Sequence, residues 1–538
     1  MILYTLILLP LITGLVVAMS PEGRAKSVAL AGSLLSLAAT LVAVGQFDWA
    51  RTDQFQFVSS ALPLVPPLNI NLTVGVDSIA LWLIVLTSFL QPLCVLGSFT
   101  AITERRKTYY AWLTVLQAAM TGVFASRDVV FFYICFEFTL LPMYVLISLY
   151  GSTNRRKAAT KFFLYTFTGS IIALAGIVYV AWKASAGGAD WTFDIDALTG
   201  AARTMSPREQ ALVLGALMAG FAVKVPLFPL HTWLPLAHTE APTAGSVVLA
   251  GVLLKLGTFA ILRFVLPMVP LAVVEYTPLI AIVSVVGILY GGLICWVQRD
   301  VKKLVAYSSV SHRGFCVLGM FALNSIGLGG SVLYMINHGL STGALFFCIG
   351  FMYERYHTRS LDEVGGLLNK MPVWSFFMVF FTLASVGLPG LNGFVSEFMC
   401  LLGTFQSGAQ GVGGTPGRLG PVYAAIAGTG MIVGAIYLLF MLGKIVFGEL
   451  REPVGHHHHD SLPVDLGPRE IGVLVPLAVA CIVLGVLPTP MLRTLEKPLD
   501  RVVAVYRTGN LLGSGPSSAP VAQADPDVMR TSVEEAAP

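Results

Sequence analysis

The chain has 538 residues, of which 56% are hydrophobic and only 12% are charged, and its formal net charge is +4 at pH 7. Soluble globular domains carry roughly 25% charged residues. The low charged fraction and a mean hydropathy of +0.78 exclude a soluble enzyme, a nucleic-acid-binding protein and a disordered scaffold. The short alternating segments of a membrane barrel do not occur in the sequence. We therefore expect an all-α polytopic membrane protein.

Long apolar runs predict the membrane-spanning helices, each of which needs about 20 residues. The first run lacks a basic flank and a small-residue cleavage site, so we expect a retained span and not a signal peptide. We expect 47–76, which contains Pro63 and Pro66, to form a surface hairpin, and 508–538 to be a disordered tail. The runs predict about 14 helices, at 1–19, 27–46, 77–100, 108–126, 128–150, 160–182, 209–230, 244–266, 275–297, 303–323, 329–353, 372–405, 421–448 and 471–492.

Lysine and arginine are distributed unevenly among the loops. The loop after the first run, and every second loop from there, hold most of the loop cations, including the clusters at 105–107 and 155–157. Cytoplasmic loops carry the excess of such residues in helical membrane proteins. We therefore expect these loops in the cytoplasm and both termini on the outer side. The four histidines 456–459 then fall on a cytoplasmic loop, where we expect a solvated segment without a catalytic role.

The seven cysteines all lie within apolar runs, far apart in the sequence. No cysteine or histidine spacing typical of a zinc site, an iron–sulfur cluster or a disulfide framework occurs among them. No dinucleotide-binding glycine motif occurs either. We therefore expect no metal and no cofactor on this chain.

Ionisable residues near the middle of apolar runs form the candidate site. Each costs about 2.5 to 3.5 kcal/mol at a helix centre, so such residues face one another or internal water and mark an ion path. One of them alone is compatible with a structural ion pair or a core histidine, but acids and bases spread over six runs indicate a proton route. They are Glu137, Lys224, Lys255, His312, Arg313, His338 and Glu397.

Two of the predicted helices, the seventh and the twelfth, contain helix-breaking residues. Pro226 and Pro229 follow Lys224, and Pro389, Gly390 and Gly393 precede Glu397. Proline removes a backbone donor and clashes with the preceding turn, and unwound backbone at membrane depth is tolerated only inside protein or around a hydrated cavity. The matching positions of the breaks predict two inverted five-helix repeats, although ordinary packing kinks remain an alternative.

A long motif carries a resemblance to a known family. The segment KVPLFPLHTWLPLAHTEAPTAGSVVLAGVLLKLG, which begins at Lys224, resembles the signature of the antiporter-like membrane subunits of respiratory complex I and their Mrp-antiporter relatives. The segments CFEFTLLPMYVLI, DVKKLVAYSSVSHRGF, INHGLSTGALFF and GLPGLNGFVSEF match in the same order. The resemblance covers roughly 70–450. The acid on the twelfth span, Glu397, is similar to that of the M-type branch, because the L- and N-type branches usually carry lysine there.

The resemblance implies a role for each candidate residue. By this resemblance, Glu137 and Lys224 correspond to the carboxylate–lysine pair of the family, and Lys255 corresponds to its central lysine. Glu397 corresponds to the terminal acid. His312 and His338 correspond to the histidines of the hydrated axis, and His231 corresponds to a residue that helps proton uptake from the cytoplasm. The sequence departs from the family at Leu236, where the signature commonly has an acid. Because of this departure, it is in doubt whether a carboxylate at this position takes part in proton uptake, although the carboxylate of Glu240 lies close by in the sequence.

The function implied by the resemblance is proton pumping driven by NADH:quinone electron transfer in partner subunits. The partners implied are L- and N-type neighbours in a bacterial inner membrane and, indirectly, the peripheral redox arm. The implied organisation is N-terminal helices at 1–107, a first repeat at 108–266, a second at 267–448, a loop with the last span at 449–507, and the tail. An Mrp-type Na⁺/H⁺ antiporter subunit and a structural membrane spacer remain alternatives.

Overall fold

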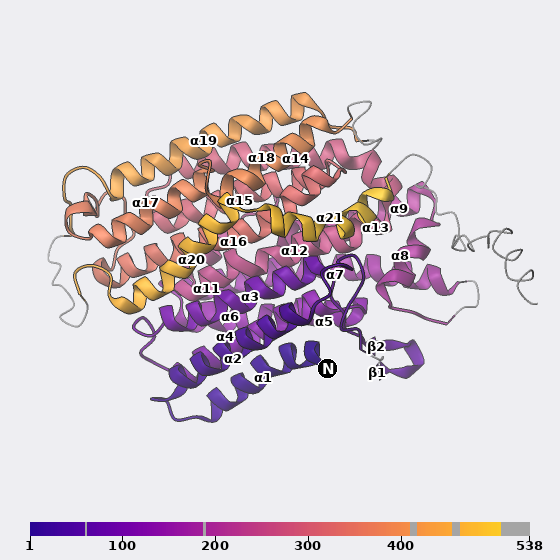
Figure 1. The fold of residues 1–538 in the computed structure, drawn as a ribbon, viewed down its shortest axis with the longest axis horizontal. Helices are drawn as coiled ribbons and strands as arrows, with labels where there is room; N and C mark the ends of the chain where they lie inside the picture. The colour runs from indigo at the N-terminus through magenta and orange to yellow at the C-terminus, as the bar shows by residue number, and fades with distance from the viewer. Residues whose placement is uncertain (60–61, 187–189, 409–416, 454–462, 507–538) are drawn as a thin grey trace, which may run out of the picture.

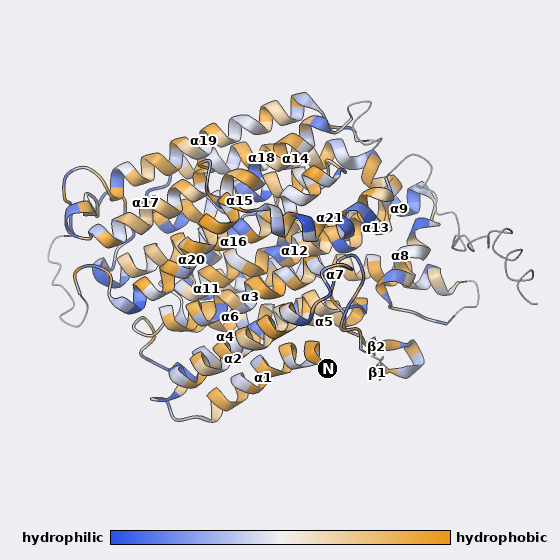
Figure 2. Ribbon diagram, viewed as in Figure 1, coloured by the Kyte–Doolittle hydropathy of each residue, from blue (hydrophilic) through white to orange (hydrophobic). Residues whose placement is uncertain are grey.

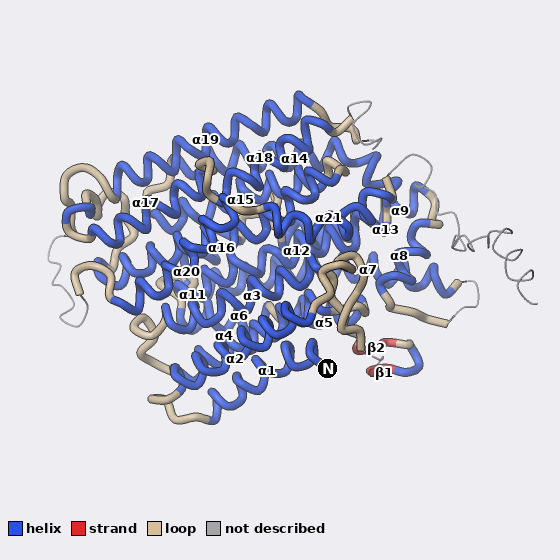
Figure 3. The backbone as a smooth tube through the Cα atoms, in the orientation of Figure 1, coloured by secondary structure: helices blue, strands red, loops and turns tan. Residues whose placement is uncertain are grey.

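The computed structural model describes residues 1–59, 62–186, 190–408, 417–453 and 463–506. These residues form one bundle of helices that lie side by side, with α1 along one edge and α19 along the opposite edge (Figure 1). The two short strands of the described part lie together at one end of the bundle (Figure 3). The histidines 456–459 and the tail 508–538 lie outside the described residues.

The N-terminal part contains four long helices and a small hairpin. The helices are α1 (Ile2–Met19), α2 (Ala25–Gln46), α3 (Ser78–Gly97) and α4 (Arg106–Ala125). Between α2 and α3, β1 (Leu62–Val65) pairs antiparallel with β2 (Ile70–Leu72) across the turn η1 (Pro66–Leu68). The surface hairpin predicted within 47–76 is therefore confirmed.

The middle of the chain forms the helices that carry the lysines. They are α5 (Val129–Phe138), α6 (Leu140–Tyr150), α7 (Arg155–Ser185), α8 (Ile195–Arg203), α9 (Pro207–Lys224), α10 (Leu234–Glu240), α11 (Thr243–Val248), α12 (Leu254–Ala260) and α13 (Leu266–Met268). Two π-helical turns, η2 (Leu249–Leu253) and η3 (Ile261–Val265), join α11, α12 and α13 into one span.

The remaining helices complete the bundle. They are α14 (Pro270–Trp296), α15 (Val301–Met320), α16 (Ser325–Tyr356), α17 (Pro372–Val386), α18 (Asn392–Gln406), α19 (Pro421–Ile445), α20 (Pro468–Val486) and α21 (Thr489–Ala504), with a short turn η4 (Leu367–Asn369) before α17. Helices α20 and α21 return to the centre and pack against α16 and α3, as Figure 1 shows in yellow.

Ten helices of the described chain are long and apolar enough to cross a membrane by length and composition. The other predicted runs are also helical, at α4, α9, α15 and the pair α17 and α18. Figure 2 shows apolar residues along most helices, with polar residues at the two ends and also in the middle of the bundle. The most apolar 18-residue stretches of the spans Thr243–Met268 and Ser325–Tyr356 are completely buried inside the protein, so polar side chains on these stretches are shielded from lipid.

Both predicted helix breaks are present. Helix α9 ends at Lys224, and no helix forms again until α10 begins at Leu234. Helix α17 ends at Val386, and the next residue, Gly387, adopts a left-handed conformation with φ of +85°. A side chain is disfavoured at that φ, so the glycine permits the turn that leads into α18.

The last predicted span differs from the structure. The run at 471–492 was expected to be one helix, but α20 ends at Val486 and a separate helix, α21, follows. Pro488 lies between them and Pro490 lies in the first turn of α21, since proline fits the first turn of a helix but not its interior. The indole of Trp82 on α3 donates to the hydroxyl of Thr494 on α21 over 2.9 Å, which fixes α21 against the N-terminal half.

Candidate functional site

The predicted site residues lie on six neighbouring parts of the bundle. Helix α5 carries Glu137, α9 ends at Lys224, α12 carries Lys255, α15 carries His312 and Arg313, α16 carries His338, and α18 carries Glu397. Every one of these side chains except Glu137 is almost completely buried. Buried charges in an apolar bundle need partners or internal water, so their contacts decide what the site can do.

Lys224 lies at the break of α9 and reaches toward α5. Its Nζ is 3.3 Å from Oγ1 of Thr139 and 3.5 Å from the carbonyl of Phe136, and it lies 4.4 Å from the centre of the Phe136 ring. Thr139 separates α5 from α6, a local irregularity that we did not expect from the sequence. These contacts place the ammonium beside the helical turn that carries the predicted acid.

The expected partner of Lys224, Glu137, makes no direct contact with it. Both carboxylate oxygens of Glu137 are buried and have no hydrogen-bond partner among the described residues. The described ion pairs, counted within 4.0 Å, do not join this carboxylate to Lys224. The two groups therefore lie near each other but apart, and their coupling remains a prediction.

Lys255 occupies the centre of the enclosed span, between the two π-helical turns. Its Nζ donates to the carbonyl of Ala250 in the first turn and lies 3.4 Å from Nδ1 of His338. A π-helical turn widens the helix and frees a carbonyl from its usual partner, and such turns occur frequently at functional sites. Gly257 also lets this span approach α9, because a Cβ there would lie 2.8 Å from Val225 and 3.1 Å from the Cβ of Lys224.

His338 is held by a second cation. Nη2 of Arg313 donates to Nδ1 of His338 over 3.2 Å and to the Ala250 carbonyl over 3.5 Å. Nε2 of His338 has no partner among the described residues. The structure thus brings Lys255, Arg313 and His338 together around one ring nitrogen and one carbonyl.

The acid of α18 belongs to a short hydrogen-bonded network. Tyr334 donates to Oε1 of Glu397, and Nδ1 of His312 lies 3.2 Å from that oxygen and 2.5 Å from the Tyr334 hydroxyl. The rings of His312 and His338 are 5.6 Å apart between centroids. A cavity of about 10 Å³ adjoins both rings and Glu397, about the smallest that holds one water molecule.

His231 does not join this group. Its ring packs against Phe228, Tyr290 and Tyr307, and its Nδ1 has no partner among the described residues. The predicted role of His231 in proton uptake therefore gains no direct contact with the central residues and stays a prediction.

Sequence reasoning missed two residues of the site. Tyr334 bridges His312 and Glu397, and only its position four residues before His338 on the same enclosed helix could have indicated it. His238 on α10 stacks on Phe346 at 4.7 Å, and both its ring nitrogens are buried without a partner among the described residues. His238 lies within the segment that resembles the family signature, but its spacing from other residues did not indicate a role.

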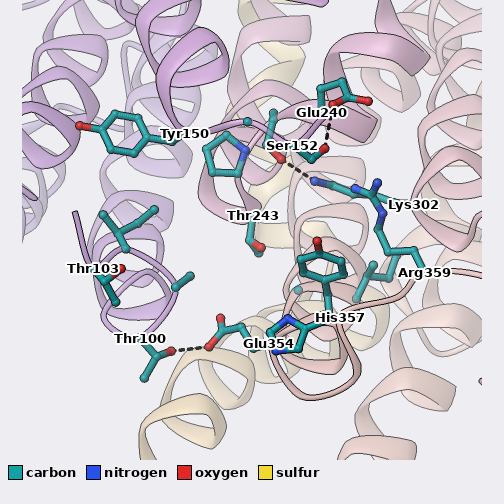
Figure 4. Close-up of a pocket in the computed structure, with 18 of the residues that line it drawn as sticks. Thr100, Thr103, Tyr150, Ser152, Glu240, Thr243, Lys302, Glu354, His357 and Arg359 are labelled. Atoms are coloured by element: carbon teal, nitrogen blue, oxygen red, sulfur yellow. Dashed lines mark hydrogen bonds between the residues drawn. The ribbon is translucent and has the colours of Figure 1, made fainter. Parts of the chain in front are cut away.

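A cavity of about 670 Å³ opens at the lysine- and arginine-rich end of the bundle. Figure 4 shows Glu240, whose carboxylate accepts from the Ser152 hydroxyl, and Lys302, whose Nζ donates to the carbonyl of Ala241. Arg359 lines the same cavity and donates to the carbonyl of Thr239 over 2.6 Å. The cavity therefore reaches the end of α10, one short helix away from the break at Lys224.

Comparisons with known proteins agree with this arrangement. A family model described as NADH:quinone oxidoreductase/Mrp antiporter, transmembrane region, matches residues 126–412. NADH-ubiquinone oxidoreductase chain 4 of Marchantia polymorpha is 39% identical over 503 residues, which cover 93% of this chain and 96% of the relative. NADH-quinone oxidoreductase subunit M of Rhodobacter capsulatus is 40% identical over 497 residues, which cover 89% and 92%.

Solved structures show the same fold. A chain of respiratory complex I from Thermus thermophilus with bound NADH superposes with a TM-score of 0.80 at 27% identity, covering 94% of this chain and all of that chain. A chain of the Mrp complex from Dietzia sp. DQ12-45-1b has a TM-score of 0.78 at 22% identity, with 95% and 99% covered. This second likeness shows the fold alone.

Proposed function

The chain belongs to the NADH:quinone oxidoreductase/Mrp antiporter family of membrane subunits, and from this membership we propose that it is the M-type proton-translocating subunit of a respiratory complex I. The relatives at 39% and 40% identity carry the names chain 4 and subunit M of that enzyme. An Mrp-type antiporter has weaker support, because the likeness to the Mrp complex lies in the fold.

One observation carries this proposal, namely a row of buried polar groups that crosses the apolar bundle. It begins at Lys224, continues through Lys255 and His338, and ends at the network of His312, Tyr334 and Glu397. Apolar packing alone does not require so many buried ionisable groups, each of which is costly in a membrane. A path for protons does require them.

The groups support the following proton path. Protons enter from the large cavity beside Glu240 and reach Lys224, with His231 as the predicted helper. Lys224 keeps its proton while Glu137 is close and releases it toward Lys255 when that contact is lost. Lysine suits this step because its proton affinity changes readily on burial, whereas arginine stays charged. His338, His312 and Tyr334 then pass the proton to Glu397, which releases it on the outer side.

The driving energy comes from partner subunits. Moving one proton against 100 mV costs about 2.3 kcal/mol, and the sequence contains no motif for a redox cofactor. We therefore assign this chain a non-redox pumping role, with NADH oxidation and quinone reduction in other subunits and with L- and N-type subunits as membrane neighbours.

The proposed setting is a bacterial inner membrane, with the large cavity facing the cytoplasm and both termini outside. This orientation follows from the lysine- and arginine-rich loops at the cavity end. The two helix breaks, at the ends of α9 and α17, support a division into inverted repeats at 108–266 and 267–448 with half-channels that open to opposite faces.

Substitution of Glu397 tests the function in the assembled complex. We expect Glu397→Gln to lower NADH-driven proton pumping in sealed membrane vesicles by at least about tenfold, since proton-transfer groups contribute factors of this size or more. Glu397→Asp retains part of the pumping because a carboxylate remains.

The matched control is Glu496→Gln, which removes an exposed carboxylate from α21 and leaves pumping unchanged. All rates are normalised to the amount of assembled complex. Equal pumping by Glu397→Gln and the unsubstituted complex contradicts the proposal. Co-purification with small antiporter subunits, without flavin and iron–sulfur subunits, indicates the Mrp-type alternative.

A further inference from the structure

Arg313 is a buried cation that forms no ion pair with an acid among the described residues. Its side chain is 1% exposed, its Nε has no hydrogen-bond partner, and the ion pairs of the described residues do not include it. Arginine does not give up its proton in proteins, so this position holds a permanent positive charge inside the bundle. A charge of that kind is expensive, and its contacts show what it does there.

Arg313 and Lys255 share the same two acceptors. Both donate to the carbonyl of Ala250, and both point at Nδ1 of His338, at 3.2 Å and 3.4 Å respectively. An imidazole nitrogen offers one lone pair, and arginine can only donate. The contact with Arg313 therefore requires Nδ1 to carry no proton, so a neutral His338 has its proton on Nε2.

This arrangement aligns His338 for transfer. The proton-free Nδ1 faces Lys255, and the ring also lines the small cavity shared with His312 and Glu397. When Nη2 of Arg313 releases the Nδ1 lone pair and keeps its bond to the Ala250 carbonyl, a proton that leaves Nζ of Lys255 forms an N–H bond at Nδ1. The proton on Nε2 then leaves across the small cavity to the carboxylate of Glu397, which accepts it. The ring afterwards flips or exchanges its proton, and Arg313 favours this reset because it can donate only to a bare nitrogen.

The same guanidinium acts on the charged intermediate. When His338 carries two protons, a second positive charge stands about 3.2 Å from Nη2 of Arg313, and at that separation like charges repel strongly in a low-dielectric interior. The other titratable groups near His338 among the described residues are Lys255, His312, Tyr334 and His238. Among the described residues that line the small cavity beside His338, Glu397 carries the carboxylate, so the repulsion directs the proton there.

We propose that Arg313 is a positioning residue that keeps Nδ1 of His338 open toward Lys255 and drives the transferred proton onward to Glu397. This inference rests on the proposed function and adds to it a residue that never carries the proton itself. It also predicts a direction of transfer, because Arg313 makes His338 a poor resting place for a proton.

The test compares Arg313→Met with Arg313→Lys in the whole complex. We expect Arg313→Met to lower the rate of NADH-driven proton pumping, normalised to assembled complex, by roughly tenfold, the effect of losing one hydrogen bond to a charged group. The loss is larger at acidic pH and smaller at alkaline pH, because a proton on His338 is no longer repelled. Arg313→Lys keeps the charge, and we expect it to restore most of the pumping and the original pH profile.

Lys303→Met is the matched control, because it removes an exposed cation from the first turn of the same helix, and it leaves pumping and the pH profile unchanged. Arg313→Met that pumps normally at every pH overturns the inference. Equal losses in the Met and Lys variants with an unchanged pH profile also overturn it, since the guanidinium then serves only packing.

Two further arms keep the result decisive. If Arg313→Met does not assemble, Arg313→Lys carries the test alone, and an assembled Lys variant that pumps as poorly as Glu397→Gln contradicts the inference. Glu397→Gln in the same vesicles separates the two proposals. Normal pumping by Glu397→Gln rejects the proposed function, whereas loss there with normal pumping by Arg313→Met rejects only the role of Arg313.

Discussion

The two halves of the buried path differ in how their acids are held. In the first half, Lys224 contacts Thr139 and Phe136, while both oxygens of Glu137 lack a partner among the described residues. In the second half, Glu397 already accepts from Tyr334 and lies beside His312. The same kind of buried acid is therefore separated from its base in one half and bound in a network in the other.

This difference indicates different tasks. A lysine and a carboxylate that lie near each other but apart can pair or separate through side-chain movement, which suits a switch that controls proton release. A carboxylate held by a tyrosine and a histidine is already organised for transfer and needs little rearrangement. We therefore expect the first half to control the proton and the second half to conduct it.

The largest loss of pumping is expected when Lys224 or Glu137 in the first half of the path is replaced. Lys224→Ala removes the proton carrier, and Glu137→Gln leaves the carrier without its control, so each lowers NADH-driven pumping at least about tenfold. The loss of pumping in the double variant is clearly smaller than the sum of the two single losses, expressed as free energies, because the effects of residues that serve one step are not additive. The measurement is proton uptake in vesicles for the two singles and the double, normalised to complex content.

Strict additivity contradicts the switch. So does a Glu137→Gln variant that pumps normally, because Glu137 then serves only packing. The assembled complex must be present in the membranes in each case, since a lost buried charge also destabilises folding. Glu496→Gln on α21 serves again as the control for loss of an exposed carboxylate.

The sequence predicted the helices, the helix breaks and the buried charges of both halves, but not the contacts between their side chains. Hydropathy located the helices, and the prolines after Lys224 and the glycines before Glu397 located the breaks, because backbone chemistry acts locally. The mid-membrane charges were visible because a charged residue within an apolar run is rare and costly, whichever segment supplies its partner. Each of these signals lies within one short segment.

The features that could not be predicted from the sequence depend on several segments of the chain at once. The π-helical turns beside Lys255 pack against α16 and α9, and the apolar residues that form them are of ordinary helical character. Tyr334 looks like a core aromatic residue until α18 brings Glu397 to its hydroxyl. The separation of Glu137 from Lys224 likewise depends on side-chain positions, which no spacing determines.

A smaller loss of pumping is expected when the hydrogen-bonded network of the second half is weakened. Tyr334→Phe removes the hydroxyl between His312 and Glu397 and leaves the ring, so the carboxylate keeps the histidine as its neighbour. We expect pumping to fall about fivefold, which corresponds to about 1 kcal/mol, the typical net value of one hydrogen bond. Tyr423→Phe, the same change on α19 outside the path, leaves pumping unchanged. Equal rates in both variants would show that His312 serves Glu397 without the tyrosine.

The smallest effect is expected at Thr139, the residue whose hydroxyl contacts Lys224. Thr139→Val removes this hydroxyl at nearly constant volume and leaves Lys224 with the carbonyl and ring of Phe136. We expect a two- to threefold loss of pumping, because one modest hydrogen bond is lost, and we expect Thr139→Ser to restore it.

Thr166→Val is the matched control for this change, since Thr166 on α7 is buried and donates to the carbonyl of Phe162, just as Thr139 donates to that of Phe136. The measurement is again NADH-driven proton uptake in vesicles, normalised to complex content. If Thr139→Val pumps like the control, the hydroxyl does not place Lys224. The switch of the first half then depends on Glu137 alone. A loss as large as that of Lys224→Ala would instead make Thr139 part of the proton path, because a hydroxyl can pass on the proton that it receives.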